Sequence, residues 1–190
     1  MPRVLAYPAP PLTAGRIVLR PWQEGDLVVV AEASRDPYIP QITTVPAPYS
    51  DEAGLAWIAR QEERVAAGVG LPFCVADAAT DRARGFCALW LDERHRARAR
   101  CGYWLAPSAR GHGLAVTALT LVADWAFASC GIVRLELLIE PQNAASRRVA
   151  ERAGFAPAAG MRELHGRALS RFVRAAPHRK VWRPAAPGRV

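Results

Sequence analysis

The chain has 190 residues, of which 51% are apolar and 22% are charged. This length and balance indicate a single folded domain and exclude a disordered chain. The net charge of +8 favours anionic partners, such as a phosphorylated cofactor, an acidic protein or nucleic acid, although a basic surface without a special partner explains it equally well.

No run of 18 apolar residues is present, so we expect no membrane-spanning helix. The first residues lack the apolar core of an export signal, which predicts a cytoplasmic protein. We expect a proline-rich arm at 1–13, one domain at 14–184 and a tail at 185–190. The cysteines form no C-x-x-C pair, which argues against a metal site and predicts small buried side chains; they are Cys74, Cys87, Cys101 and Cys130.

The first half of the sequence predicts one strand, two helices and then three strands in succession. Asp26 and Ser50 are residue types that cap helix N-termini, and Gly68 is typical of a helix end. The proline-rich residues 34–50 predict a long connection of the kind that often lines a site. The expected elements are a strand at 16–22, helices at 26–34 and 50–68, and strands at 71–77, 83–92 and 99–107.

The second half of the sequence alternates between helices and strands. Apolar residues recur at helical spacing from Gly113 to Cys130, and Asn143 and Gly154 bracket a second helix. Strands are expected at 133–141, 155–164 and 168–176. Successive strands followed by alternating helices and strands indicate an α/β fold. We expect a mixed, mostly antiparallel central sheet of about six or seven strands with helices on both faces.

The segment Arg110-Gly-His-Gly-Leu-Ala115 lies between a predicted strand and the N-terminus of a predicted helix. Unpaired N–H groups and the helix dipole favour an anion there, and glycine lets the backbone approach a phosphate. A tight turn is the simplest alternative. No Lys-Ser or Lys-Thr follows, which excludes a P-loop, and a dinucleotide fingerprint requires glycine where Val116 stands.

These residues also resemble a known family. Arg110-x-x-Gly113-x-Ala115 resembles the [RQ]-x-x-G-x-[GA] acyl-CoA loop of the GNAT superfamily of N-acetyltransferases, and "EPQNAASRRVAERAGF" is similar to the later part of that signature. The stretch "LRPWQEGD" resembles the opening of the ribosomal-protein-alanine acetyltransferase (Rim) branch. The resemblance covers residues 14–163. It implies acetyl-CoA-dependent transfer to a primary amine by direct attack on the thioester, without metal.

The resemblance also implies where acetyl-CoA binds. The strand at 101–106 would separate from residues 137–140, and the opening would hold the pantetheine arm. The N–H of Leu105 would stabilise the oxyanion, and the loop would bind the pyrophosphate with added charge from Arg110. The implied cofactor-binding residues are Leu105, Arg110, Gly111, His112, Gly113, Leu114, Ala115 and Asn143.

The catalytic candidates depart from the family pattern at one position. Many members place a tyrosine four residues before the closing glycine, where this chain has Ala150. Ser146 is therefore the candidate proton donor, and its alternative is an ordinary helix serine that bonds its own backbone. Glu136 is the candidate general base, and its alternative is a surface glutamate or one half of an ion pair. Asn143 is also a natural helix cap, and both of its roles can hold together.

The acceptor is left open by the sequence: a protein N-terminus, a lysine or a small amine are all compatible with it. An α-amine has a pKa of about 7.7–8.0 and a lysine about 10.4, so an enzyme without a strong base fits the α-amine better. A homodimer is also compatible. The alternatives are an acyl-CoA sensor of the same fold without turnover and, less favoured, an RNA- or ribosome-binding module that uses the basic residues of 93–100 and 166–184.

Overall fold

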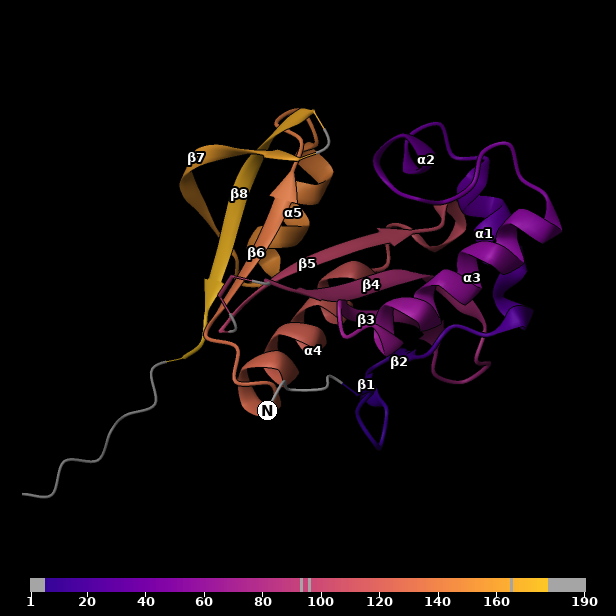
Figure 1. Ribbon diagram of the computed structural model, residues 1–190, viewed down its shortest axis with the longest axis horizontal. Coiled ribbons are helices and arrows are strands. Elements are labelled where there is room, and N and C mark those ends of the chain that lie inside the picture. Colours follow the sequence, from indigo (N-terminus) through magenta and orange to yellow (C-terminus); the bar gives the residue numbers. More distant parts are fainter. Residues whose placement is uncertain (1–5, 93, 96, 165, 178–190) are drawn as a thin grey trace, which may run out of the picture.

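The computed structural model describes residues 6–92, 94–95, 97–164 and 166–177. These residues build one eight-stranded sheet in the order β1-β2-β3-β4-β5-β6-β8-β7 (Figure 1). Of the described pairs, β5 with β6 is parallel and the others are antiparallel. The strands are β1 Leu12–Ala14, β2 Ile17–Arg20, β3 Gly70–Asp77, β4 Ala83–Leu91, β5 Arg98–Leu105, β6 Arg134–Ile139, β7 Ala156–Leu164 and β8 Arg167–Ala175.

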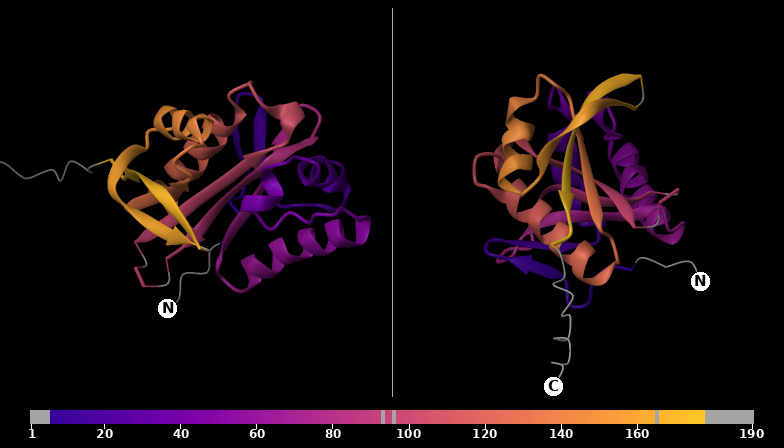
Figure 2. Two further views of the ribbon diagram at one scale, coloured as in Figure 1. Left: turned by 90° about the horizontal axis from the view of Figure 1, so that it is seen from above. Right: turned by 90° about the vertical axis from the view of Figure 1, so that its left-hand side faces the viewer.

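Helices cover both faces of this sheet, as Figure 2 shows from two sides. One face carries α4 and α5, and the opposite face carries α1, α2 and α3. No helix among the described residues combines the length and the apolarity needed to cross a membrane. The helices are η1 Glu24–Asp26, α1 Leu27–Ser34, α2 Ile39–Ile42, α3 Asp51–Ala66, η2 Pro107–Ala109, α4 Leu114–Ser129 and α5 Ala144–Arg152.

The predicted mixed α/β fold is confirmed, with one strand more than expected. The additional strand is β1, which pairs with β2 through a turn at Gly15 and contains Leu12 and Thr13 of the expected arm. The second addition is α2, within the connection predicted at 34–50. Both elements are only three or four residues long, too short for a periodic pattern. The tail at 185–190 and the basic residues 178–184 lie outside the described residues.

The two faces of the sheet have different cores. The side under α4 and α5 is mainly aliphatic, whereas the side under α1 and α3 holds an aromatic cluster. Trp22 and Trp57 meet edge to face with their ring centroids 4.8 Å apart, and Phe86 stacks on Trp104 at 6.0 Å. All four cysteines are buried, as predicted. The aromatic cluster gives the second face a rigid wall.

The strands β5 and β6 pair along only part of their length. Their parallel ladder runs from Arg98 opposite Arg134 to Cys101 opposite Leu137. Both strands continue further, β5 to Leu105 and β6 to Ile139. Because the pairing stops while the strands continue, the sheet opens there, and β6 proceeds with β7 and β8 away from β5 (Figure 1).

A buried ion pair fixes the start of the domain. Arg20 at the end of β2 donates to both carboxylate oxygens of Asp26, at 2.8 and 2.9 Å, and its Nε donates to Asp81 at 2.6 Å. Arg20 and Asp26 are only 8% and 5% exposed. This geometry explains two residues of the "LRPWQEGD" stretch: they join β2 to η1 and the β3–β4 turn.

We predict that Asp26→Ala destabilises the fold by about 3–5 kcal/mol, because it leaves the Arg20 guanidinium buried without its bidentate partner. Urea denaturation at neutral pH measures this change. Glu24→Ala is the matched control, since Glu24 is exposed on the same 3-10 helix. A loss below about 1 kcal/mol for Asp26→Ala would contradict the role of this pair.

Candidate active site

The glycine-rich loop between β5 and α4 has the backbone shape that the sequence predicted. Gly111 and Gly113 have φ values of 85° and 74°, in the left-handed region that favours glycine. Gly113 is the residue before α4, and no side chain caps that helix end. A Cβ added at either glycine would meet nothing within 4 Å. The first-turn N–H groups therefore face an unobstructed approach, which suits an anion.

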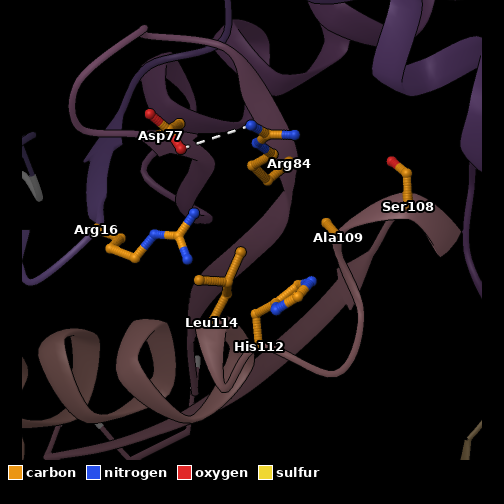
Figure 3. A pocket seen from close by; sticks show the side chains of 7 residues that line it. All are labelled: Arg16, Asp77, Arg84, Ser108, Ala109, His112 and Leu114. Carbon is orange, nitrogen blue, oxygen red and sulfur yellow. Dashed lines mark ion pairs between the residues drawn. The ribbon is translucent and has the colours of Figure 1, made fainter.

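The side chains of Arg110 and His112 in this loop have partners or surroundings of their own. Arg110 forms an ion pair with Asp36 at 2.8 Å and donates from Nε to the carbonyl of Leu105 at 3.2 Å. His112 extends into a small cavity of about 100 Å³, toward which Arg16 also extends (Figure 3). The backbone of the loop, rather than the Arg110 guanidinium, is thus oriented for a phosphate.

Asp36 links Arg110 to the segment that follows α1. Its Oδ1 accepts hydrogen bonds from the N–H groups of Tyr38 and Ile39, both at 2.9 Å. Burial raises the pKa of Asp36, but these two N–H groups and the Arg110 guanidinium together hold it below its usual value. Asp36 therefore stays ionised at neutral pH and joins the glycine-rich loop to the start of α2.

The edge of β5 beyond Cys101 faces the opening in the sheet. The N–H of Ala106 donates to the carbonyl of Arg84 at 3.0 Å, so it points toward β4. Successive N–H groups of a strand alternate in direction. The N–H groups of Leu105 and Tyr103 consequently point to the other side, where β6 has diverged. This is the orientation that an oxyanion donor at Leu105 requires.

Asn143 and Ser146 lie at the start of α5, on the far side of the same opening. Asn143 caps the helix, because its Oδ1 accepts from the Ser146 N–H at 2.9 Å, and its amide donates to the Tyr38 hydroxyl at 3.0 Å. The Ser146 hydroxyl lies 2.7 Å from the Tyr103 hydroxyl of β5. Burial raises the pKa of Tyr103 to about 12, against a smaller opposing effect of Ser146. Two neutral hydroxyl groups thus face each other across the opening.

Glu140 is the residue after β6, and both Glu140 and Asn143 are hydrogen-bonded to Tyr38. Its carboxylate accepts from the Tyr38 hydroxyl and from Arg167 of β8 at 2.7 Å. Burial, and then the Glu140 carboxylate, raise the pKa of Tyr38. Tyr38, Glu140 and Arg167 form one hydrogen-bonded group that joins three distant parts of the chain.

Glu136 has the ion-pair role that the sequence left open as its alternative. Arg171 donates to its Oε1 at 2.7 Å and Arg162 to its Oε2 at 2.9 Å. It is 7% exposed and does not line the large cavity described next. Since both of its oxygens are bound by guanidinium groups, the geometry favours a structural role over that of a general base.

A cavity of about 740 Å³ begins at the opening and extends toward α3. Cys101 and Leu137, the last paired residues of β5 and β6, line it together with Asn143 and Ser146. Its walls are largely aromatic, formed by Tyr38, Trp57, Phe86, Trp90, Tyr103 and Trp104. Its charged lining residues are Arg64, Arg100, Arg167 and Glu140. Such a concave, mostly apolar cavity with a few convergent polar groups is typical of a substrate site.

The sequence analysis missed Tyr103 and Tyr38. Tyr103 lies 43 residues from Ser146 in the chain, and no local motif links them. Strand alternation places Tyr103 on the same face as Cys101 and Leu105, but only the opening of the sheet makes it a site residue. Tyr38 lies in the proline-rich connection, which was predicted to line a site without any particular residue being identified.

The family can now be assigned from comparison with known proteins. A family model described as "Acetyltransferase (GNAT) domain" matches residues 16–156. This chain belongs to the GNAT acetyltransferase family. A curated relative, the "Probable N-acetyltransferase YjcK" of Bacillus subtilis (strain 168), is 32% identical over 108 residues. That match spans 56% of this chain and 60% of the relative, so it covers less than two thirds of the relative's length.

Solved structures of GNAT proteins have the same fold. RimJ of Mycobacterium smegmatis, in complex with CoA-disulfide, has a TM-score of 0.67 at 20% identity and covers 84% of this chain and 82% of its own. RimL, a ribosomal L7/L12 alpha-N-protein acetyltransferase in complex with coenzyme A, has a TM-score of 0.68 at 19% identity and covers 87% and 96%. At these identities the likeness concerns the fold.

The raised pKa of Tyr103 makes the stability of the GNAT domain depend on alkaline pH. An unfolded tyrosine ionises with a pKa of about 10, whereas that of Tyr103 is about 12. This group's stabilising effect is therefore complete below pH 10 and is lost as pH rises from about 10 to 12. By about pH 11 the unfolding free energy lost through this group amounts to roughly 1 kcal/mol.

We predict that Tyr103→Phe reduces the loss of unfolding free energy between about pH 9 and pH 11 by that amount. Urea denaturation of both proteins at the two pH values measures the difference. An identical loss in the variant and the wild type would show that Tyr103 is not held protonated by its surroundings.

Proposed function

We propose that this chain is an acetyl-CoA-dependent N-acetyltransferase of the Rim branch, which acetylates a primary amine by direct attack on the thioester. The single observation that supports it most is the divergence of β5 from β6 after Cys101 and Leu137. This opening lies between a bare helix N-terminus, at Leu114, and a large cavity on the opposite face. A donor and an acceptor can therefore meet there from two sides.

The residues present fit coenzyme A. The first-turn N–H groups of α4, from Leu114 onward, would bind the pyrophosphate, because Gly111 and Gly113 leave the approach open. The N–H and carbonyl groups of Tyr103, on the free edge of β5, would bind the pantetheine amides. The bound thioester supplies the activated acetyl group. The Leu105 N–H would then stabilise the charge on the acetyl oxygen, a contact worth about 2.7–4 kcal/mol.

The proton that the departing sulfur needs comes from the Tyr103–Ser146 pair in this proposal. Ser146 replaces the tyrosine that many family members carry where this chain has the buried Ala150. Its hydroxyl would donate to the sulfur, and the Tyr103 hydroxyl, 2.7 Å away, would hold it in place. As the N–C bond forms and the C–S bond breaks, Ser146 would pass its proton to the sulfur and take up the proton that the amine loses, so that the serine ends the step neutral.

The ion pairs of Glu140 and Glu136 leave neither carboxylate free as a base, which favours an acceptor amine of low pKa. Glu140 is bound by Tyr38 and Arg167, and Glu136 by two arginines. Neither is available as a strong base. An α-amine, with a pKa of about 7.7–8.0, is partly neutral at neutral pH, whereas a lysine near 10.4 is almost entirely charged. We therefore propose the α-amine of a protein or peptide as the acceptor, the class that the name of RimL states for that protein.

We predict that coenzyme A binds with micromolar affinity and that Gly113→Trp abolishes binding, because the side chain would occupy the approach to the α4 N-terminus. Isothermal calorimetry measures both. Gly160→Trp is the matched control: Gly160 also has a positive φ, of 80°, and open space around its Cβ, but it lies in β7. Absence of binding to the folded wild type would contradict the proposed function.

We predict that Ser146→Ala lowers kcat roughly a hundredfold, the range of general acid catalysis, and leaves the Kd of acetyl-CoA within about twofold. Release of free thiol in the presence of α-amine and lysine peptides measures kcat. Ser129→Ala, at the exposed end of α4, is the control. Tight acetyl-CoA binding without any turnover by the wild type would instead support an acyl-CoA sensor.

A further inference from the structure

The large cavity has a strongly basic end. Trp90 of β4 stands directly opposite Arg100 of β5 in the antiparallel ladder, and the Arg64 guanidinium from α3 lies over the Trp90 ring at 5.4 Å. All three residues line the cavity, as do Phe86 and Trp104. Arg64 and Arg100 therefore flank one indole ring, and apolar walls surround them.

These two arginines form no ion pair within the described part of the chain. Of the cavity's charged residues, Arg167 and Glu140 form an ion pair at 2.7 Å. No described carboxylate oxygen lies within 4 Å of a side-chain nitrogen of Arg64 or Arg100, as the ion pairs of the structure show. Arg64 donates only to the amide oxygen of Gln61, at 2.6 Å. Burial, followed by the charge of Arg60, lowers the pKa of Arg64.

The nearest acid to Arg100 in the sheet is already bound. Glu136 stands opposite Arg100 in the parallel ladder, but its two oxygens accept from Arg162 and Arg171. Two positive charges thus border an aromatic cavity, and neither forms an ion pair with the described residues. In surroundings of low dielectric, such a pair attracts an anion much more strongly than it would in water.

We propose that the acceptor amine carries an apolar, preferably aromatic, group and, beyond it, an oxyanion that binds between Arg64 and Arg100. This inference rests on the proposed function and specifies its substrate class. Ser146, Arg64 and Arg100 all line the same cavity, so an acceptor with its α-amine near Ser146 can extend through that cavity toward the two arginines. The oxyanion is a carboxylate or a phosphate, since either matches a guanidinium pair.

The test is calorimetric binding of matched peptides to the protein saturated with coenzyme A. The probes are Ala-Phe-Glu-amide, Ala-Phe-Gln-amide, Ala-Phe-Lys-amide and Ala-Phe-phosphoserine-amide. We expect the glutamate peptide to bind at least tenfold more tightly than the glutamine peptide, and the lysine peptide to bind most weakly. The glutamate and phosphoserine peptides, compared with each other, show which oxyanion is preferred.

Variants test whether Arg64 and Arg100 cause the preference for the glutamate peptide. We expect Arg64→Gln and Arg100→Gln each to reduce the preference for glutamate over glutamine to below about threefold. Arg60→Gln and Arg98→Gln are matched controls that keep it, because both residues are exposed on the same helix and the same strand.

Equal affinity for the glutamate and glutamine peptides, or no binding of any peptide, would overturn the proposal. The same holds if the exposed controls lose the preference as strongly as Arg64→Gln and Arg100→Gln. Acetyl transfer, followed separately by release of thiol, distinguishes the two levels. Equal transfer to glutamate and glutamine peptides would leave the proposed function standing and remove this inference. Selective binding of the glutamate peptide without acetyl transfer would leave this inference standing and remove the proposed function.

Discussion

The site depends on an interruption of one parallel strand pair. After Cys101 and Leu137 the ladder between β5 and β6 ends, although both strands continue. Backbone N–H and C=O groups along this edge need partners other than β6, which side chains, water or a bound ligand can supply. The free edge at Tyr103 and Leu105 is suited to the linear, amide-bearing arm of coenzyme A.

In the proposed function, the opening separates a donor side from an acceptor side. The loop before α4 and the start of α5 would bind the donor, and the aromatic cavity, which residues of α2 and α3 help to line, would bind the acceptor. Contacts between the loop before α4 and the other side include the ion pair of Arg110 with Asp36, and Ser108 donates from its N–H and hydroxyl to Glu32 of α1 at 2.7 and 2.9 Å. The donor loop is thereby held in a fixed position relative to the acceptor cavity.

The part of this arrangement that the sequence predicts is local. Glycines before a helix, a capping Asn143 and Ser146 three residues later are short-range patterns, and the structure has the backbone shapes they imply. The separation of residues 101–106 from β6 was expected only through the family resemblance, and the register confirms it. The fold class followed from the order of strand and helix patterns.

The side-chain partners could not be read in this way because they come from distant elements. The two arginines that bind Glu136 belong to β7 and β8, and Arg110 reaches Asp36 across the first half of the chain. Tyr103 becomes a partner of Ser146 only when the sheet opens between them. A short motif predicts the local backbone conformation, whereas the partners of an ion pair depend on how the strands are ordered in the sheet.

A crystal structure of the chain with coenzyme A tests most directly whether the opening between β5 and β6 is the catalytic centre. The account predicts the pantetheine arm along the edge of β5 at Tyr103 and Leu105, the pyrophosphate at the N-terminus of α4 and the sulfur close to Ser146. Coenzyme A bound wholly within the aromatic cavity or beside His112, with the edge of β5 left empty, would contradict it.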